Sequence, residues 1–261
     1  FDVLVIGAGH AGCEAAAAAA RRNARVGLLS FGGDDAGVLS CNPSIGGVGK
    51  GHLVRELDVF DGLMAGAADA STIHRRMLNR SKGAAVWGPR VQADRKRYRQ
   101  AIKTRLTGNG VIRVTGEAVE VCLSGDRVEG VKLADGSILQ ARSVVIATGT
   151  FLDARIFVGQ HSEPAGRRGE ASSVPLSAQL REIGLGQGRL KTGTPPRLDG
   201  RSIDWARLAE QPGDREPWTM SMFAGSASKL PQLACAVTRT TAQTHQIIAE
   251  NFDASPLFSG A

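Results

Sequence analysis

The stretch of sequence that decides the fold is Phe1-Asp2-Val3-Leu4-Val5-Ile6-Gly7-Ala8-Gly9-His10-Ala11-Gly12. An apolar run leads into Gly-x-Gly-x-x-Gly, an alanine-rich helical segment (13–22) follows, and a second apolar run (24–30) comes next. This order predicts a strand, a glycine turn, a helix and a strand, the unit that binds the pyrophosphate of a dinucleotide. Gly7 permits the tight turn, Gly9 lets phosphates approach the backbone, and Gly12 lets the helix pack closely. Because the helix N-terminus also attracts anions, we expect a nucleotide to be held by Gly7, Ala8, Gly9, His10, Ala11 and Gly12.

Length and composition set broad limits. The 261 residues suffice for one large domain or one and a half, and 42% are apolar, enough for a core. No apolar run reaches the roughly 18 residues that span a bilayer, so we expect no membrane partner. The chain opens on a strand with no visible signal peptide. We expect a bacterial cytoplasmic location, with a mitochondrial one left open because Phe1 is compatible with a removed targeting segment.

The cysteines and the charged residues make different predictions about ligands. Cys13, Cys41, Cys122 and Cys235 fit neither a zinc pattern nor a disulfide framework, so we expect no metal and a reducing compartment. Between positions 75 and 105 there are eleven basic residues and a single acid, so this segment holds more than the whole net charge of +7. That excess favours a nucleic acid partner over a merely solvated helix face. The candidate contacts are Arg90, Arg95, Lys96, Arg97 and Arg99.

Hydrophobic periodicity predicts the elements that follow. We expect helices over 53–60, 65–79 and 92–106, with a loop over 80–90. The period then changes to two, which predicts strands over 111–121, 127–133 and 137–141, joined as a meander by hairpin-type turns. A mobile loop over 159–173 and a short helix over 176–183 come later. A strand over 234–238 and a helix over 240–251 complete the expected elements.

An apolar strand over 143–147 ends in Ala147-Thr148-Gly149 and returns the chain to the sheet beside the nucleotide. An initial glycine turn, a meander and a closing Ala-Thr-Gly strand together favour FAD over NAD. Val119, on the strand that borders the adenine in this fold, is then either an adenine contact through its backbone or an ordinary strand core residue. Thr148 and Gly149 are further candidate cofactor contacts. One departure concerns the end of the second strand, where an acid usually binds the ribose hydroxyls. Ser30 stands there, so the ribose contact must be weaker or come from elsewhere.

These patterns predict an α/β protein with two domains. Residues 1–198 are expected to form a Rossmann-like FAD-binding domain of the two-dinucleotide flavoprotein type, with a β-meander insertion. The composition shifts at Asp199, and we expect 199–261 to begin a second, inserted nicotinamide-binding α/β domain.

The chain resembles the MnmG/GidA family of tRNA wobble-uridine modification flavoproteins over nearly its whole length. The resemblance rests on the glycine turn and on further motifs: Ser40-Cys41-Asn42-Pro43-Ser44-Ile45-Gly46-Gly47 with Gly49-Lys50-Gly51-His52-Leu53, Leu78-Asn79-Arg80-Ser81-Lys82-Gly83, Gln92-Ala93-Asp94-Arg95, Ala147-Thr148-Gly149-Thr150-Phe151-Leu152, and 188–197. It implies an FAD enzyme that uses NADH and methylene-tetrahydrofolate. Such an enzyme, with an MnmE-type GTPase, adds a carboxymethylaminomethyl or similar aminomethyl-type group at C5 of the wobble uridine, and it works as a homodimer on tRNA.

The resemblance also implies roles for single residues. Cys41 is the expected catalytic thiol, activated by a helix N-terminus or by Lys50; otherwise it is a small buried side chain. Ser173 aligns with a family FAD contact, although the sequence alone shows only a loop serine. Lys191 is expected to hold the flavin ring or a substrate phosphate; otherwise it belongs to a rigid turn. Family members continue well past Ala261, so we expect this chain to be an incomplete amino-terminal portion. Two alternatives stay open: a folate- and FAD-dependent tRNA uridine methyltransferase, and a catalytically silent cofactor- and tRNA-binding module.

Overall fold

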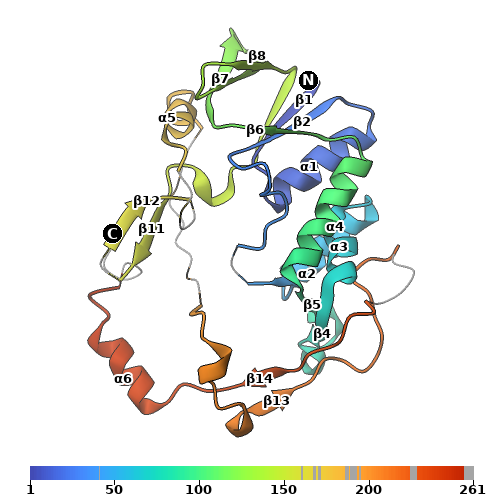
Figure 1. Ribbon diagram of the computed structural model, residues 1–261, viewed down its shortest axis with the longest axis vertical. Coiled ribbons are helices and arrows are strands. Elements are labelled where there is room, and N and C mark those ends of the chain that lie inside the picture. Colours follow the sequence, from blue (N-terminus) through green and yellow to red (C-terminus); the bar gives the residue numbers. More distant parts are fainter. Residues whose placement is uncertain are drawn as a thin grey trace. The chain divides into compact units, whose positions relative to one another are not determined.

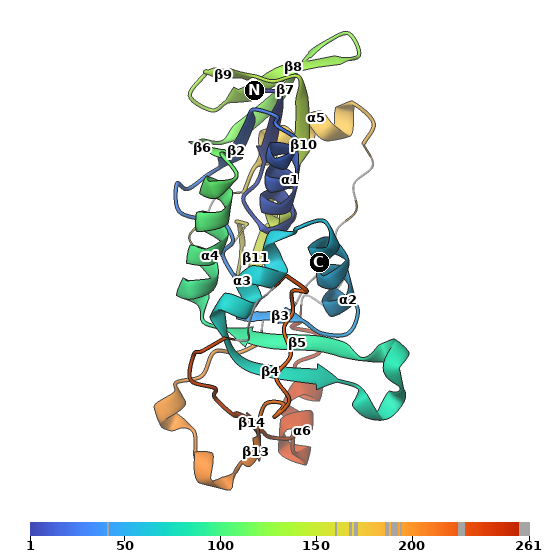
Figure 2. The same ribbon diagram turned by 90° about the vertical axis from the view of Figure 1, so that its right-hand side faces the viewer.

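The computed structural model describes residues 1–40, 42–159, 161–166, 169, 172–185, 188, 193, 195–223 and 228–255 (Figures 1 and 2). The chain forms two compact units, and it enters each of them twice. Unit 1 contains Phe1–Gly149 and Pro212–Ala234, and unit 2 contains Thr150–Gln211 and the residues from Cys235 onward. The domain boundary expected between residues 198 and 199 stays a prediction.

A parallel four-stranded sheet organises unit 1. Its strand order is β10-β1-β2-β6, formed by β10 (Ser143–Ile146), β1 (Val3–Ile6), β2 (Val26–Ser30) and β6 (Ile112–Thr115). All three pairings are parallel. Helix α1 (His10–Arg21) connects β1 to β2, as the glycine turn predicted. The Rossmann-like α/β fold is therefore confirmed, and the carboxyl ends of the strands meet at the edge where such sheets bind ligands.

Helix α1 packs on this sheet, and two further helices pack on α1 and complete the core. Helix α1 buries Cys13, Ala16 and Ala17, whose small side chains let it lie close to β1 and β2. Helix α4 (Arg95–Gly108) buries Tyr98, Ile102 and Leu106, spaced by four residues and therefore on one face. Figure 1 shows α4 beside α3 (Leu63–Ser71).

A buried carboxylate joins the first helix to the third. Glu14 on α1 accepts hydrogen bonds from the backbone N–H groups of Leu63, at 2.9 Å, and Met64, at 2.8 Å. These are donors of the first turn of α3, which have no partner within the helix. A negative charge also interacts favourably with the positive end of a helix dipole, so Glu14 fixes the start of α3.

A second, antiparallel sheet corrects two of the predicted helices. It has the order β3-β5-β4, with β3 (Ser44–Gly46), β5 (Gly88–Ala93) and β4 (Thr72–Leu78), and α2 (Lys50–Val59) follows β3. The helix predicted over 65–79 was wrong beyond Ser71, because 72–78 pair with β5 as a strand. The helix predicted over 92–106 begins only at Arg95. Its N-cap is Asp94, whose carboxylate accepts the N–H of Arg97, and the residues before it belong to β5.

The loop predicted over 80–90 is shorter than expected. It consists mainly of two 3₁₀ turns, η1 (Arg80–Lys82) and η2 (Ala84–Val86), at the tip of the β4–β5 hairpin seen in Figure 2. The indole N–H of Trp87 donates to the carbonyl of Arg80 at 3.2 Å and so closes this tip.

The predicted meander is confirmed as β7 (Ala118–Ser124), β8 (Arg127–Leu133) and β9 (Ile138–Gln140), all antiparallel. The prediction of a single strand over 111–121 is wrong, because this stretch forms two strands, β6 and β7, that belong to different sheets. Gly116 separates the two parts, and its φ of +158° is rare for any other residue. The strand before it pairs with β2, and the strand after it starts the meander.

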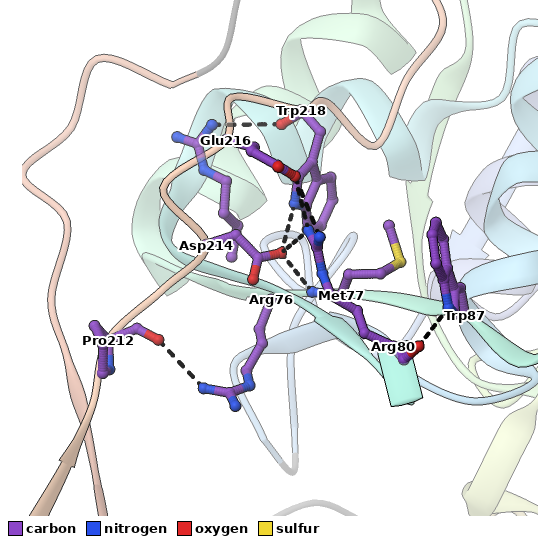
Figure 3. Close-up of polar contacts among 9 residues, drawn as sticks. Arg76, Met77, Arg80, Trp87, Pro212, Asp214, Glu216 and Trp218 are labelled. Carbon is purple, nitrogen blue, oxygen red and sulfur yellow. Dashed lines mark hydrogen bonds and ion pairs between the residues drawn. The ribbon is translucent and has the colours of Figure 1, made fainter. Parts of the chain in front are cut away.

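The segment Pro212–Ala234, which we call the strap, returns from unit 2 to unit 1 and binds there through carboxylates. Figure 3 shows the Asp214 carboxylate accepting hydrogen bonds from Met77 N at 2.7 Å, Trp218 Nε1 at 2.9 Å and Arg80 Nη2 at 3.2 Å. Burial alone would raise the pKa of Asp214, but these donors outweigh it and lower the pKa. Arg76 also donates to the carbonyl of Pro212. These contacts attach the start of the strap to unit 1.

Unit 2 consists of short elements. It has a β-hairpin of β11 (Arg155–Val158) and β12 (His161–Pro164), a helix α5 (Val174–Glu182), and a strand pair of β13 (Ala209–Gln211) and β14 (Cys235–Val237). Its last helix, α6 (Ala242–Glu250), starts with a capping box of Thr241 and Thr244. Its 3₁₀ turns are η4 (Gly200–Ser202) and η5 (Trp205–Arg207), while η3 (Gly149–Phe151) spans the junction between the units in sequence. The loop predicted over 159–173 contains a strand, β12, because residues 161–164 pair with β11.

Within the described part of the chain, no helix is long and apolar enough to cross a membrane.

Candidate dinucleotide-binding site

The glycine turn between β1 and α1 has no room for side chains at two of its three glycines. Gly7 has a φ of +107°, and a Cβ built there would lie 2.3 Å from the carbonyl oxygen of Ala147. A Cβ on Gly12 would lie 1.7 Å from the carbonyl oxygen of Gly7. The N–H of Gly7 donates to Leu29 at 2.8 Å, which ties the turn to β2. The first and third glycines therefore let β1, α1 and β10 approach one another.

The middle glycine faces open space instead. A Cβ on Gly9 would meet no atom within 4 Å, and Gly9 itself is exposed. Gly9 is the N-cap of α1, where no side chain caps the helix and no acid stands in the first turn. Among the described residues, the space within 4 Å of a Cβ on Gly9, at the positive end of the helix dipole, is therefore free of side chains, as a pyrophosphate requires. The turn fits a dinucleotide.

His10, the first residue of α1, lies partly inside the protein. Burial, with a smaller contribution from the charge of Lys50, lowers the pKa of His10 to about 4. Its ring meets that of Tyr98 edge-on, with 5.7 Å between centroids. Within the described residues His10 Nε2 and the Tyr98 hydroxyl are buried without a hydrogen-bond partner. A neutral, largely buried imidazole is a packing element at pH 7, so a contact of His10 with the nucleotide through its backbone remains a prediction.

Two further predicted cofactor residues lie at the same sheet edge. Thr148 and Gly149 come just after β10. The pairing of β10 with β1 extends to Ala147, whose N–H donates to the Ile6 carbonyl at 2.8 Å. Gly149 has a φ of +60° and open space at its Cβ position. The end of β10 thus joins the glycine turn in a region lined by small residues.

Val119 shows a backbone feature that fits its predicted role. The register between β7 and β8 shifts between Ala118, opposite Leu133, and Glu120, opposite Lys132. Val119 is the extra residue of this β-bulge and has no Cα partner on β8. An adenine contact at Val119 remains a prediction.

The remaining cofactor and catalytic candidates are Cys41, Ser173 and Lys191. Cys41 and Lys191 lie outside the described residues. Ser173 belongs to unit 2, where it is buried and its N–H donates to the carbonyl of Phe151 at 2.9 Å. Among the residues that the structure describes, no cluster of His, Cys, Asp and Glu is suited to a metal ion. Sequence reasoning also overlooked Asp35, whose carboxylate lies beside Ser30 at the end of β2.

The basic segment is partly neutralised by carboxylates from other elements. Arg80 pairs with Asp214 and Glu216, Arg105 pairs with Asp61, and both Arg99 and Lys103 pair with Asp34. These acids lie outside the segment, so its sequence alone overstates the local charge.

The five candidate nucleic acid contacts differ in their surroundings. Arg95, Lys96 and Arg97 are exposed on the first turn of α4, and neither Lys96 nor Arg97 has an ion pair within the described part of the chain. Arg99 is half-buried against Asp34, and Arg90 is half-buried in β5, where its Nε is buried without a hydrogen-bond partner. A groove of about 430 Å³ runs beside this turn, with Arg97, Gln100 and Arg105 on one side and Gly66 and Ala70 of α3 on the other. Among the five candidates, the exposed charges are therefore those at the start of α4.

Comparison with known proteins gives consistent results. The family model described as Glucose inhibited division protein A matches residues 2–261. The tRNA uridine 5-carboxymethylaminomethyl modification enzyme MnmG of Zymomonas mobilis is 54% identical over 262 residues, which cover 100% of this chain and 42% of that protein. The protein of the same name from Granulibacter bethesdensis is 49% identical, with the same coverage.

A solved structure agrees with these relatives. Aquifex aeolicus GidA, in its form I crystal, superimposes with a TM-score of 0.93 at 41% identity, covering 99% of this chain and 44% of that one. The chain thus spans less than half the length of the relatives it matches.

Proposed function

The chain belongs to the glucose-inhibited division protein A family, and on this premise we propose that it is the dinucleotide-binding portion of an FAD-dependent tRNA-modifying enzyme. The reaction proposed for the whole protein adds a carboxymethylaminomethyl or related aminomethyl-type group at C5 of the wobble uridine. The observation that carries the proposal is the glycine turn, whose open middle glycine and uncapped helix fit a pyrophosphate in a chain 54% identical to a protein named for this modification.

The cofactor proposal divides the work between the chain and its ligands. FAD, when bound, supplies the redox chemistry, with NADH as reductant and methylene-tetrahydrofolate as the one-carbon donor. The chain binds the pyrophosphate through the N–H groups at the start of α1 and excludes side chains from that space with Gly9. Thr148 and Gly149 follow the neighbouring strand β10, and the backbone of Val119, at the β-bulge of β7, is the proposed contact to the adenine edge.

Three residues of the proposal rest on the family resemblance. Cys41 is the proposed catalytic thiol, and Lys191 and Ser173 are proposed flavin contacts. An MnmE-type GTPase is the proposed partner, a homodimer the proposed assembly, and the bacterial cytoplasm the proposed location.

Two other functions compete with this one. A folate- and FAD-dependent tRNA uridine methyltransferase would use the same kind of nucleotide turn, but the identity of 54% and 49% to two proteins named MnmG favours the carboxymethylaminomethyl reaction. A cofactor- and tRNA-binding module without catalysis is the second alternative, since the chain covers 42% of each of those proteins.

Binding of tRNA tests the partner proposal. We expect the chain to bind tRNA with an affinity that falls as salt rises, because basic side chains displace counterions from phosphates. The double variant Lys96→Gln/Arg97→Gln should weaken binding and reduce the slope of log affinity against log salt by about 1 for each phosphate that is no longer neutralised. Fluorescence anisotropy of labelled tRNA at several salt concentrations measures both quantities.

The matched control removes the same charge elsewhere in unit 1. Arg127 and Arg142 are exposed basic residues outside the basic segment, on β8 and just before β10. Arg127→Gln/Arg142→Gln should change affinity and slope much less than the α4 variant. Equal effects of the two double variants would exclude the start of α4 as a contact, and an absence of salt-dependent binding by the wild-type chain would exclude the tRNA proposal.

A further inference from the structure

The sequence has no acid at the end of β2, where Ser30 stands, but the structure brings the carboxylate of Asp35 to that place. In Rossmann-like sites an acid at the end of the second strand binds the ribose hydroxyls. Here β2 ends in Ser30, and its hydroxyl lies 2.7 Å from Asp35 Oδ1. An acid five residues later in the chain therefore folds back to the end of that strand.

The loop fixes this carboxylate from both sides. The N–H of Gly32 donates to Asp35 Oδ2 at 3.2 Å, while the Ser30 hydroxyl contacts Asp35 Oδ1 and the Gly32 carbonyl at 3.0 Å. An ionised carboxylate has about four lone-pair positions. The two donors named here leave acceptor capacity on Asp35 for a ligand.

The same loop is tied to the glycine turn. The N–H of Gly37 donates to the carbonyl of Ala8 at 3.0 Å. Gly37 has a φ of +68°, and a Cβ built there would lie within 2.9 Å of Ile102, so the loop follows the path that only glycine permits here. Asp35 thus lies beside the end of β2, in a loop whose Gly37 is bonded to the glycine turn.

The neighbouring acid, Asp34, contacts a different element. Asp34 pairs with Arg99 and Lys103 of α4, and its side chain is 66% exposed. Two adjacent acids therefore have separate surroundings, one at the end of β2 and one at α4.

We propose that Asp35 supplies the carboxylate that accepts hydrogen bonds from the ribose hydroxyls of the adenosine half of the dinucleotide. The inference rests on the proposed function, because it requires a dinucleotide at the glycine turn. It makes Asp35 a residue that positions the cofactor and takes over the role of the acid absent at position 30.

The test compares FAD with an FAD analogue whose adenosine ribose lacks the 2′-hydroxyl. Flavin fluorescence quenching measures the affinity of the chain for each. In the wild-type chain we expect removal of the hydroxyl to weaken binding about tenfold, as for the loss of a hydrogen bond to a charged group. Asp35→Asn should weaken FAD binding and reduce the penalty for the missing hydroxyl to a few-fold at most, while Asp34→Asn, the matched control, should keep the full penalty.

Each outcome has a defined meaning. Equal penalties in the wild-type chain, Asp35→Asn and Asp34→Asn would overturn the inference while leaving FAD binding intact. A wild-type chain that binds neither form of FAD would overturn the proposed cofactor, and the inference with it. If Asp35→Asn melts before it can be titrated, Ser30→Ala replaces it, because it loosens the carboxylate without removing it. The hydroxyl penalty should then fall below that of the wild-type chain, and an unchanged penalty would contradict the inference.

Discussion

A chain carrying Gly12→Ala is expected to lose most of its stability together with its ability to bind FAD. The added Cβ would lie 1.7 Å from the carbonyl oxygen of Gly7, and neither atom belongs to a flexible side chain. Helix α1 would have to move away from β1, whose residues Leu4 and Val5 are completely buried. Overpacking of a close-packed core costs about 1–3 kcal/mol and sometimes more. We expect a loss at or above about 3 kcal/mol, measured by urea unfolding, with no flavin bound after purification.

The same substitution at a glycine with space around it provides the control. Gly108 is the last residue of α4, and a Cβ there would meet no atom within 4 Å. Gly108→Ala should leave flavin binding unchanged and raise stability by less than about 1 kcal/mol, because alanine is the better helix former. A Gly12→Ala chain as stable as Gly108→Ala would show that α1 and β1 do not approach as described.

Removal of the Asp69 carboxylate is expected to release the strap from unit 1. Asp69 on α3 accepts the backbone N–H groups of Met220 at 2.7 Å and Ser221 at 2.8 Å, and Met220 is completely buried. Each buried N–H left without a partner costs about 1–3 kcal/mol. Asp69→Ala leaves two such groups, so we expect a loss of about 2–6 kcal/mol in urea unfolding. The strap should also become sensitive to a protease at low concentration.

A graded series strengthens that test. Asp69→Asn keeps one acceptor oxygen and should lose about half as much stability as Asp69→Ala. Asp126→Ala, at an exposed position in the turn between β7 and β8, should stay within about 0.5 kcal/mol of the wild-type chain. If Asp69→Ala unfolds at the same urea concentration as Asp126→Ala, the strap is not held by this carboxylate.

Local patterns predicted the nucleotide half of the fold well. The turn from Gly7 to Gly12, the helix after it and the meander depend on glycine positions and on hydrophobic periodicity over short stretches. Such signals are present in the sequence itself, and the structure confirms the elements they predicted. The same approach failed to predict strand β4. Its residues Arg75, Arg76, Met77 and Leu78 favour helices when considered alone, and only pairing with β5 makes them a strand.

Long-range polar contacts could not be predicted in this way. Asp69 binds the backbone of a residue 151 positions later, and Asp34 neutralises Arg99 and Lys103 across 65 or more positions. Nothing in the spacing of these residues signals the contact, because it depends on the packing of α3 and α4. The Asp35 carboxylate was missed for a related reason. The sequence predicted only that a ribose contact must be weaker or come from elsewhere than Ser30, and the loop path that brings Asp35 to Ser30 has no signal in local spacing.

Titration of FAD against the wild-type chain and its Gly9→Ala variant tests the central claim most directly. A Cβ at position 9 enters open space, so the fold should remain. The loss of stability should be about 1 kcal/mol, the usual effect of an alanine at an N-cap. That Cβ would occupy the space into which the pyrophosphate must fit. We predict that the wild-type chain binds FAD and that Gly9→Ala, with an almost unchanged melting temperature, binds it at least about tenfold more weakly. Equal affinity of the two chains, or no FAD bound by the wild-type chain, would contradict the account.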